Sequence, residues 1–413
     1  MDRPQRDPGA GVPLNVLIVD RAPPTDLMQG NALIAANVLP RLQDVELTLV
    51  APVTGDADAE RATLGTMFAG VHLVPRGPRV SAIGGSLEPS LARFIPRTPG
   101  LEGRVDLVAA RALRRTIDAV VRSKAWDVIH VRQLPMAGYV RPSTHGRLLE
   151  LIDSETLATG RQLGTKARVR GLVARGVERR ALATADIVTL VSPVDAAAIR
   201  RLDPRTRVEV VTNGVDTEIF SPTSAAPIEE VPDTIAFVGA MSFPPNVDAA
   251  IWLCREVLPI LQRRRPTARV RLIGRDPSPA VQALAGPAVE VTGLVADVRP
   301  EILACPIVAI PMVSGSGVKN KVLEAMSMAR PIVSTTLGVE SLDVVDGRHV
   351  VVADGPAAFA AALDHLLDDG PRRARLGTEA RAFVVEHHSW DASARRYRSL
   401  YEDLAALSRQ RRI

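Results

Sequence analysis

The segment PMVSGSGVKNKVLEAMSMARPIVST, residues 311–335, contains the pattern that decides the fold of this chain. A β-branched run ends in a glycine-bearing turn, a helix is predicted from about Val318 to Ala329, and a second β-branched run follows. Lys319 and Lys321 fall in the first turn of this helix. Positive charge is disfavoured there because a helix N-terminus is already electropositive. Some other group must therefore stabilise these lysines.

The alternation of strand and helix extends in both directions from this segment. The first half contains the apolar runs NVLIVD, VELTLVAP, DVIHVR and IVTLVS, and the second half contains TIAFVGA, ARVRLIG, VEVTG and IVAIPM. Strands that are apolar on both faces and separated by helices predict a parallel sheet covered on both sides. We therefore predict an α/β protein with two doubly wound, Rossmann-like domains that face a central cleft.

The domain boundaries follow from breaks in this alternation. Residues 1–13 are polar and proline-rich, which predicts a disordered N-terminus. The segment NGVDTEIFSPTSAAPIEEVPD, from Asn213 to Asp233, combines turn chemistry with proline, serine and alanine, which is typical of a linker. We predict an N-terminal domain at 14–213, a linker at 214–233, a C-terminal domain at 234–388 and a terminal helix at 389–413.

Length and composition limit the classes of function. A chain of 413 residues favours two domains of about 200 residues each. The net charge of +5 suits anionic small molecules or an anionic membrane surface. Aromatic residues make up only 3% of the chain, which argues against the stacking platforms that nucleic-acid-binding proteins use. We predict no nucleic-acid partner, and the oligomeric state stays undetermined.

Targeting and redox signals are weak. The polar start does not resemble a signal or transit peptide, and the apolar run at 302–313 is shorter than the about 20 residues of a membrane helix. These features predict a cytoplasmic protein. Cys254 and Cys305 lie in apolar surroundings and are predicted to be buried, reduced thiols.

Motifs for several other chemistries are missing or misplaced. No GxGxxG follows the first strand and no GxxxxGK[ST] occurs, which disfavours a dinucleotide redox enzyme and a P-loop protein. The acidic pair Asp56 and Asp58 fits the start of a helix better than a metal site. His387 and His388 are predicted to lie at the surface after a helix, and no other ligand cluster supports a metal.

Two places in the first half are candidates for a site. His130 ends the apolar run DVIHV, where the active-site groups of open α/β sheets gather, but a purely structural histidine fits this position equally well. Gly30 and Asn31 open the first predicted helix, so their backbone amides are candidates for a loop that binds an acceptor or a phosphate.

The lysines of the opening segment have two interpretations. In the simpler one, Lys321 and Glu324 form an exposed pair on the outer face of the helix, together with Asn320 and Ser327. In the other, a bound diphosphate reverses the sign of every electrostatic term, because helix amides, dipole and ammonium groups all favour an anion. Lysine before glutamate is the less favourable order for a helix pair, so we prefer the anion site.

Five motifs in sequence carry a resemblance to a known family. VVTNGVDTEIFSP, IAFVGAMSFPPNVDAAIWLCREVLP, VEVTGLVADV and PMVSGSGVKNKVLEAMSMARPIVSTTLGVESL follow one another, and SWDASARRYRSLYEDL closes the chain. Together they resemble the family-four glycosyltransferases, which have the GT-B fold. The resemblance is close over the C-terminal half and loose over the N-terminal half.

The resemblance implies a set of residue roles. Lys319 and Lys321 would face the donor diphosphate, Glu324 would bind the ribose hydroxyls, and Val295 would meet the base through its backbone. The loop Gly338–Leu342 would lend amides to the phosphates or the donor sugar. The catalytic candidates are Lys319, Lys321 and His130; the further donor-binding candidates are Asn213, Ser316, Gly317, Glu340, Ser341 and Leu342.

The chain departs from the pattern of the family at three positions. Ser316 stands where many members have a glutamate that contacts the donor sugar, as in the Gly-Ser-Gly subgroup. The loop GAMSFPPN lacks the arginine and lysine that many members place after this strand, so Lys319 and Lys321 are the expected substitutes. Arg132 replaces a second histidine two residues after His130. These changes concern the identity of the sugar more than the reaction.

The resulting hypothesis is a retaining, metal-independent glycosyltransferase without a cofactor. It would move a hexose-type sugar from a nucleotide-diphosphate sugar, bound by the C-terminal domain, to an acceptor hydroxyl at the N-terminal domain. A nucleotide-sugar epimerase and a non-catalytic sugar-nucleotide-binding protein remain alternatives. The basic segment 160–186 fits either a solvated helix face or peripheral contact with an anionic inner membrane surface.

Overall fold

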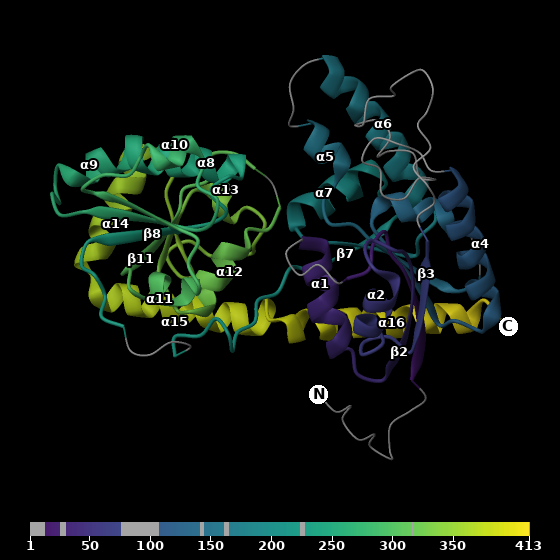
Figure 1. The fold of residues 1–413 in the computed structure, drawn as a ribbon. Helices are drawn as coiled ribbons and strands as arrows, with labels where there is room; N and C mark the ends of the chain where they lie inside the picture. The colour runs from purple at the N-terminus through teal and green to yellow at the C-terminus, as the bar shows by residue number, and fades with distance from the viewer. Residues whose placement is uncertain are drawn as a thin grey trace. The chain divides into compact units, whose positions relative to one another are not determined.

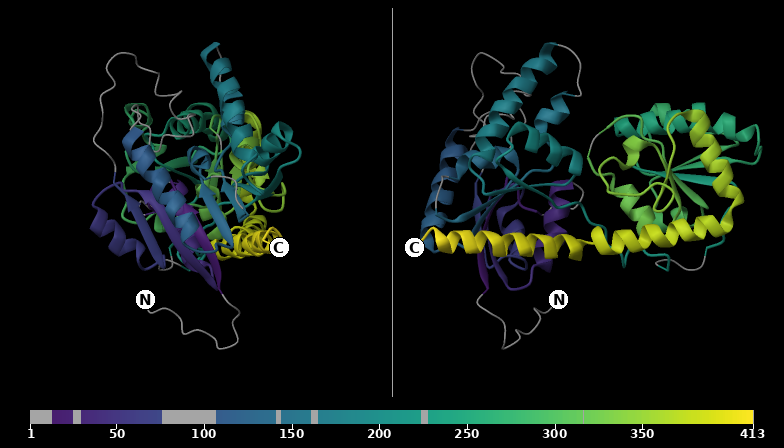
Figure 2. Two further views of the ribbon diagram at one scale, coloured as in Figure 1. Left: turned by 90° about the vertical axis from the view of Figure 1, so that its right-hand side faces the viewer. Right: turned by 180° about the vertical axis from the view of Figure 1, so that it is seen from behind.

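The computed structural model describes residues 13–24, 30–75, 107–140, 144–160, 165–223, 228–315 and 317–412. The chain forms two compact units (Figures 1 and 2). The first combines Met1–Thr212 with Ala394–Ile413, and the second comprises Asn213–Ser393. The segment predicted as a linker therefore belongs to the second unit. No helix in the described ranges is long and apolar enough to cross a membrane.

The first unit contains a seven-stranded parallel sheet with the strand order β3-β2-β1-β4-β5-β6-β7. Its strands are short and mostly buried, as the continuous apolar runs predict. The strands are β1 (Leu14–Val19), β2 (Val45–Pro52), β3 (Gly70–Val74), β4 (Val128–Arg132), β5 (Gly146–Glu150), β6 (Ile187–Leu190) and β7 (Arg207–Val210).

Helices connect these strands, and the last helix of the chain completes the unit. α16 (Trp390–Gln410) begins in the second unit, and its residues from Ala394 onward belong to the first. Asp56 caps α2 by accepting bonds from the amides of Asp58 and Ala59, as expected for a helix start. The other helices are α1 (Gly30–Val38), η1 (Leu39–Arg41), α2 (Ala57–Leu64), α4 (Leu107–Ser123), η2 (Leu134–Tyr139), α5 (Glu155–Gly160), α6 (Thr165–Leu182) and α7 (Pro193–Leu202).

The second unit contains a six-stranded parallel sheet with the order β10-β9-β8-β11-β12-β13. Its central strands β8 and β11 are buried at every position, and Cys254 and Cys305 are buried free thiols in the same core. The strands are β8 (Thr234–Val238), β9 (Arg269–Ile273), β10 (Val289–Gly293), β11 (Ile307–Ile310), β12 (Ile332–Ser334) and β13 (Val351–Val352).

Helices cover both faces of this second sheet. α8 and α10 lie over one face, and α11 and α12 lie over the other (Figure 1). A single turn of π-helix interrupts the long helix that follows β8. The elements are α8 (Pro244–Trp252), the π-segment η3 (Leu253–Val257), α9 (Leu258–Gln262), α10 (Pro279–Gln282), α11 (Val298–Leu303), α12 (Asn320–Ser327), α13 (Thr336–Val339), α14 (Pro356–Asp368) and α15 (Gly370–His387).

Each sheet has a topological switch point, where successive connections leave in opposite directions. In the first unit this point lies between β1 and β4, and in the second it lies between β8 and β11. Ligands of open α/β sheets bind outside the carboxyl ends of strands at such points. The chemistry at these two strand ends therefore decides what each unit can bind.

The start of the second unit is held against the end of α15. The amide of Val215 donates to the carbonyl of His388 at 2.8 Å, and Val215 forms a parallel bridge with Ser389. His388 is only 4% exposed, so the prediction of a surface position is wrong for this residue. The physical reason is local: its ring lies 5.1 Å from the ring of Phe383, and its carbonyl accepts the bond from the amide of Val215. His387 keeps a half-exposed side chain.

Candidate functional site

The turn after β11 has the shape that its glycines predict. Gly315 and Gly317 adopt φ angles of +105° and +75°, a region that other residues rarely enter. A methyl group on Gly315 would lie 3.2 Å from the ring of Pro245. Ser314 donates from its hydroxyl to Asp248 of α8 at 2.8 Å, so the turn is fixed on the start of that helix. Ser316 lies outside the described residues.

The helix after this turn begins later than the sequence pattern predicts. α12 starts at Asn320, so Lys319 is its N-cap residue and only Lys321 lies in the first turn. The extended backbone of Lys319 and the positive φ of Gly317 keep these residues outside the helix. A lysine side chain cannot accept a hydrogen bond, so the side chain of this N-cap residue does not cap the first amides of α12. The amide of Val322 donates instead to the carbonyl of Lys319 at 2.9 Å. Ser327, predicted on the outer face, is fully buried and donates to the carbonyl of Phe220.

Lys321 reaches across to the carboxyl end of β8. Its Nζ donates to Oδ1 of Asn246 at 2.5 Å and lies 4.6 Å from the centre of the Phe237 ring. Lys319 is 9% exposed, and its Nζ lies 3.9 Å from Oε1 of Glu340. The two lysines that looked misplaced in the sequence therefore both lie at the switch point of the second sheet, Lys319 buried and Lys321 half-buried.

Burial shifts the pKa values of two ionisable groups of α12, Lys321 and Glu324, towards 7. It lowers the pKa of Lys321 to about 7; Glu324 opposes this shift and Lys319 adds to it. Burial also raises the pKa of Glu324 to about 7, and Lys321 opposes that shift. Both groups titrate near physiological pH, and a bound anion would favour the charged form of the lysine. Such shifts at a strand end are typical of functional sites.

The loop after β12 lies at the same edge of the sheet. Thr335 accepts a bond from the amide of Gly338 and donates to the carbonyl of Met312 at 2.7 Å, so this loop is fixed to the one after β11. Ser341 and Leu342 are buried, and Glu340 is the residue that approaches Lys319. The structure therefore brings the predicted loop beside Lys319.

Two other predicted donor residues have different surroundings. Nδ2 of Asn213 donates to Oδ1 of Asn320, the first residue of α12, at 3.0 Å. The buried Oδ1 of Asn213 has no hydrogen-bond partner among the described residues. Val295 follows β10 at the edge of the sheet and packs against the core, beside the 80% exposed Leu294. Its role at the nucleotide base stays a prediction.

Sequence reasoning missed Asn246 and Gly239. The loop between β8 and α8 drew notice only because it lacks basic residues, yet Asn246 is 6% exposed and bonds directly to Lys321. A signal was present: an asparagine follows two prolines at the start of a helix, directly after a buried strand. Its partner lies 75 residues away in the sequence, and no local pattern reveals such a pair.

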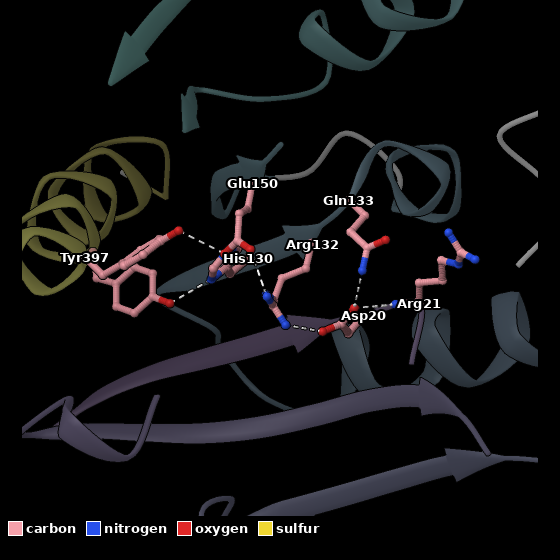
Figure 3. A network of polar contacts seen from close by, with 8 residues as sticks. Asp20, Arg21, His130, Arg132, Gln133, Glu150 and Tyr397 are labelled. Carbon is pink, nitrogen blue, oxygen red and sulfur yellow. Dashed lines mark hydrogen bonds and ion pairs between the residues drawn. The ribbon is translucent and has the colours of Figure 1, made fainter. Parts of the chain in front are cut away.

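His130 lies in a closed polar network of the first unit (Figure 3). Its side chain is 1% exposed, its Nδ1 lies 2.7 Å from the hydroxyl of Tyr401, and its Nε2 lies 3.1 Å from Oε2 of Glu150. The ring also stacks on Tyr397 of α16 at 5.6 Å. Both ring nitrogens thus face groups of the protein. The geometry favours the structural alternative for His130, and its catalytic role stays an untested prediction.

Arg132 completes this network with two carboxylates. It donates to Asp20, at the end of β1, and to Oε1 of Glu150 at 2.9 Å (Figure 3). Burial alone would raise the pKa of Glu150, but Arg132 and His130 outweigh it and hold that pKa well below its usual range. The pKa of Asp20 is raised by burial, against the opposing effect of Arg132. The charged groups at this switch point are therefore paired with one another.

Gly30 and Asn31 are the first described residues of α1. Residues 25–29, which precede them, lie outside the described ranges. The anion-binding or acceptor-binding role of these two positions therefore remains a prediction.

Two parallel Rossmann-like sheets in series are the architecture of the GT-B glycosyltransferases. The description "Glycosyltransferase Family 4" matches residues 35–219, and "Glycosyl transferases group 1" matches residues 232–369. The chain belongs to glycosyltransferase family four.

The sequence identities to individual glycosyltransferases support this assignment to the family. The chain is 30% identical over 260 residues to the D-inositol 3-phosphate glycosyltransferase of Corynebacterium diphtheriae, covering 56% of this chain and 59% of that protein. It is 30% identical over 270 residues to the alpha-maltose-1-phosphate synthase of Mycolicibacterium smegmatis, covering 57% and 67%. Anabaena HepE in complex with UDP has a similar fold, with a TM-score of 0.66 at 15% identity over 95% of this chain and 100% of that chain.

Proposed function

We propose that this protein transfers a hexose-type sugar from a nucleoside-diphosphate sugar to an acceptor hydroxyl, with retention at the anomeric carbon. The observation that carries the proposal is the arrangement at the second switch point: Lys319 and Lys321 lie at the start of α12, whose N-cap side chain accepts no bond from the helix amides. A diphosphate is the ligand that this combination of cations and amides fits. The solved complex of HepE with UDP, a protein of the same fold, supports this chemistry.

The second unit is the proposed donor site. The costly event in sugar transfer is the departure of the nucleoside diphosphate, because negative charge builds on its bridging oxygen. Lys321, Lys319 and the first amides of α12 would stabilise that charge, and preorganised donors of this kind lower a barrier by roughly 3 kcal/mol each. The same positive charges would do the work that a divalent metal does elsewhere, so we propose a metal-independent reaction without a cofactor. Glu324 would accept bonds from the ribose hydroxyls.

The first unit is the proposed acceptor site, and the acceptor proton would pass to the departing phosphate. We propose attack on the face from which the diphosphate leaves, because the carboxylate of α12, Glu324, is assigned to the ribose and not to a covalent sugar intermediate. The test is the anomeric configuration of the product, read from NMR coupling constants. An inverted product would overturn the assignment of retention.

The identity of the donor can be found by a thermal-shift panel of UDP, GDP, ADP and TDP with their common sugar conjugates. A ligand that binds only the folded state raises the apparent melting temperature. The proposal requires one of these ligands to stabilise the protein and its sugar conjugate to be consumed only when an acceptor is present. Consumption without an acceptor would instead indicate an epimerase, and binding without turnover would indicate a sensor.

We also propose peripheral contact of the first unit with anionic lipid. In the described part of α6, Leu172 is 69% exposed, and Arg175, Arg179 and Arg180 are also exposed. An apolar side chain among cations suits an anionic membrane surface. Co-sedimentation with vesicles of phosphatidylcholine alone, or with added phosphatidylglycerol, tests this contact. Equal binding to both would remove the membrane proposal and leave sugar transfer untouched.

A further inference from the structure

We propose that Asn246 is a positioning residue for sugar transfer: it holds the ammonium group of Lys321 at the carboxyl end of β8, against the leaving diphosphate. The inference rests on the proposed function and deepens it. It means that α12 supplies the cation at this strand end, in place of a basic residue from the loop after β8.

Two hydrogen bonds fix the orientation of the Asn246 amide. Its Nδ2 donates to the carbonyl of Ala240 at 2.9 Å, and its Oδ1 accepts from Nζ of Lys321 at 2.5 Å. Because the Ala240 carbonyl can only accept, the nitrogen must face it and the oxygen must face the lysine. The backbone amide of Asn246 donates to the carbonyl of Phe243 at 2.9 Å, so the residue itself is anchored at the start of α8. Lys321 thus meets an acceptor that cannot turn away.

The space for the ammonium group depends on Gly239. A methyl group at this position would lie 2.6 Å from Nδ2 of Asn246 and 2.9 Å from Nζ of Lys321. A larger residue directly after β8 would therefore displace the amide and the ammonium group from the positions in which they pair. The ring of Phe237 lies 4.6 Å away and attracts a cation through its face. These contacts place the charge of Lys321 at the strand end from which the loop offers no cation of its own.

The chemistry of the acceptor explains why it is an amide. A carboxylate at position 246 would neutralise Lys321, whereas an amide oxygen orients the ammonium group and leaves its charge for a phosphate. Among the described residues, the charged groups that act on Lys321 are Glu324 and Lys319, and both belong to the α12 region. Burial of the lysine is unfavourable without an anion and is offset when a diphosphate binds.

The experiment measures binding of UDP, GDP, ADP and TDP by isothermal titration calorimetry, below and above pH 7. The variants are Asn246→Ala, Asn246→Asp and Gly239→Ala. The control is Asn37→Ala, because Asn37 also makes a side-chain bond to a backbone carbonyl, that of Leu33 at 2.9 Å, but lies in the first unit. Thermal melting confirms that each variant is folded.

We expect Asn246→Ala to weaken binding of the preferred diphosphate about tenfold, the effect of one well-placed hydrogen bond. Affinity should fall as pH rises and Lys321 loses its proton. The midpoint of this fall should move to lower pH in Asn246→Ala, which lacks the acceptor, and to higher pH in Asn246→Asp, which adds a negative charge. Gly239→Ala should weaken binding, and Asn37→Ala should match the wild type.

The outcomes separate the two proposals. If the wild-type protein binds none of the four diphosphates, the proposed function fails. If it binds one, and the midpoints of Asn246→Ala and Asn246→Asp coincide with that of the wild type or move together, Asn246 does not position Lys321 and only this inference fails. Should Asn246→Ala not fold, the upward midpoint of Asn246→Asp and the loss in Gly239→Ala decide the question.

Discussion

The two switch points share a topology, but the cation at each of them has a different kind of partner. In the first unit, Arg132 is bonded to the carboxylates of Asp20 and Glu150. In the second, Lys321 is bonded to the neutral amide of Asn246. The carboxylates neutralise the charge of Arg132 within the fold. The amide of Asn246 is neutral, so the positive charge of Lys321 remains available to an anionic ligand. The same strand arrangement can therefore hold either a structural ion-pair network or a site for an anion. The partner of the cation determines which of the two it is.

We expect the largest effect from removing the cation of the first unit, Arg132. Arg132→Met would leave two buried carboxylates without their cation, and we expect the free energy of unfolding to drop by about 3–5 kcal/mol. Chemical denaturation measures it. Binding of the preferred nucleoside diphosphate should be unchanged in whatever fraction remains folded, because the residue lies in the other unit. A drop below about 1 kcal/mol would mean that the network is not structural.

The matched change in the second unit should affect activity and spare stability. Lys321→Met removes a cation whose hydrogen bond is to the neutral amide of Asn246. We expect the barrier to sugar transfer to rise by about 3 kcal/mol, so that kcat/KM for the sugar nucleotide falls roughly a hundredfold. The melting temperature should stay the same or rise. Near-normal turnover with undiminished nucleotide affinity would contradict the assignment of Lys321 to the diphosphate.

The stability of the protein should depend on pH in opposite ways through Glu324 in the second unit and Glu150 in the first. The pKa of Glu324 is raised to about 7, so its ionisation costs stability as pH rises from its ordinary value of 4.5 towards 7. Glu150 has a lowered pKa, so it contributes stability above its ordinary pKa, and that contribution is lost as pH falls.

We therefore expect Glu324→Gln to be more stable than the wild type by about 3 kcal/mol at pH 8, with the gain vanishing below pH 4.5. Glu150→Gln should be less stable than the wild type at pH 8. Denaturant titrations at several pH values measure both. The same sign of change at pH 8 in both variants would show that the two switch points are electrostatically alike.

The smallest predicted effect concerns the turn that positions α12. Gly315→Ala places a side chain at a φ of +105°, against the ring of Pro245, and should cost about 1 kcal/mol of stability. Gly176 in α6 is the matched control, since a methyl group there meets nothing within 4 Å. Gly176→Ala should be neutral or slightly stabilising in a thermal melt. An equal loss in both variants would mean that the turn is not strained.

The sequence predicted the parts of this structure that depend on local pattern. Apolar runs separated by amphipathic helices indicated two parallel sheets, and glycines at 315 and 317 indicated the turn. The start of α12 was missed by two residues because the backbone of Lys319 is extended, which residue propensity does not reveal.

The partners of the buried polar groups were beyond sequence reasoning. His130 meets Tyr401 across 271 positions, and Lys321 meets Asn246 across 75. Such pairs exist only once the strands have been ordered in space. The burial of His388 was missed for the same reason, because the residue that pairs with its carbonyl, Val215, lies far upstream.

The position of the α16 tyrosines in the sequence bears on the order in which the two units fold. Tyr397 and Tyr401 are fully enclosed in the first unit and bond to Glu150 and His130, yet they are synthesised after the whole second unit. A growing chain folds from its N-terminus as it emerges, and contacts between distant residues form late. The second unit can therefore fold on the ribosome while the first is still missing one of its helices. The first part of the chain to be translated is then the last to reach its native state.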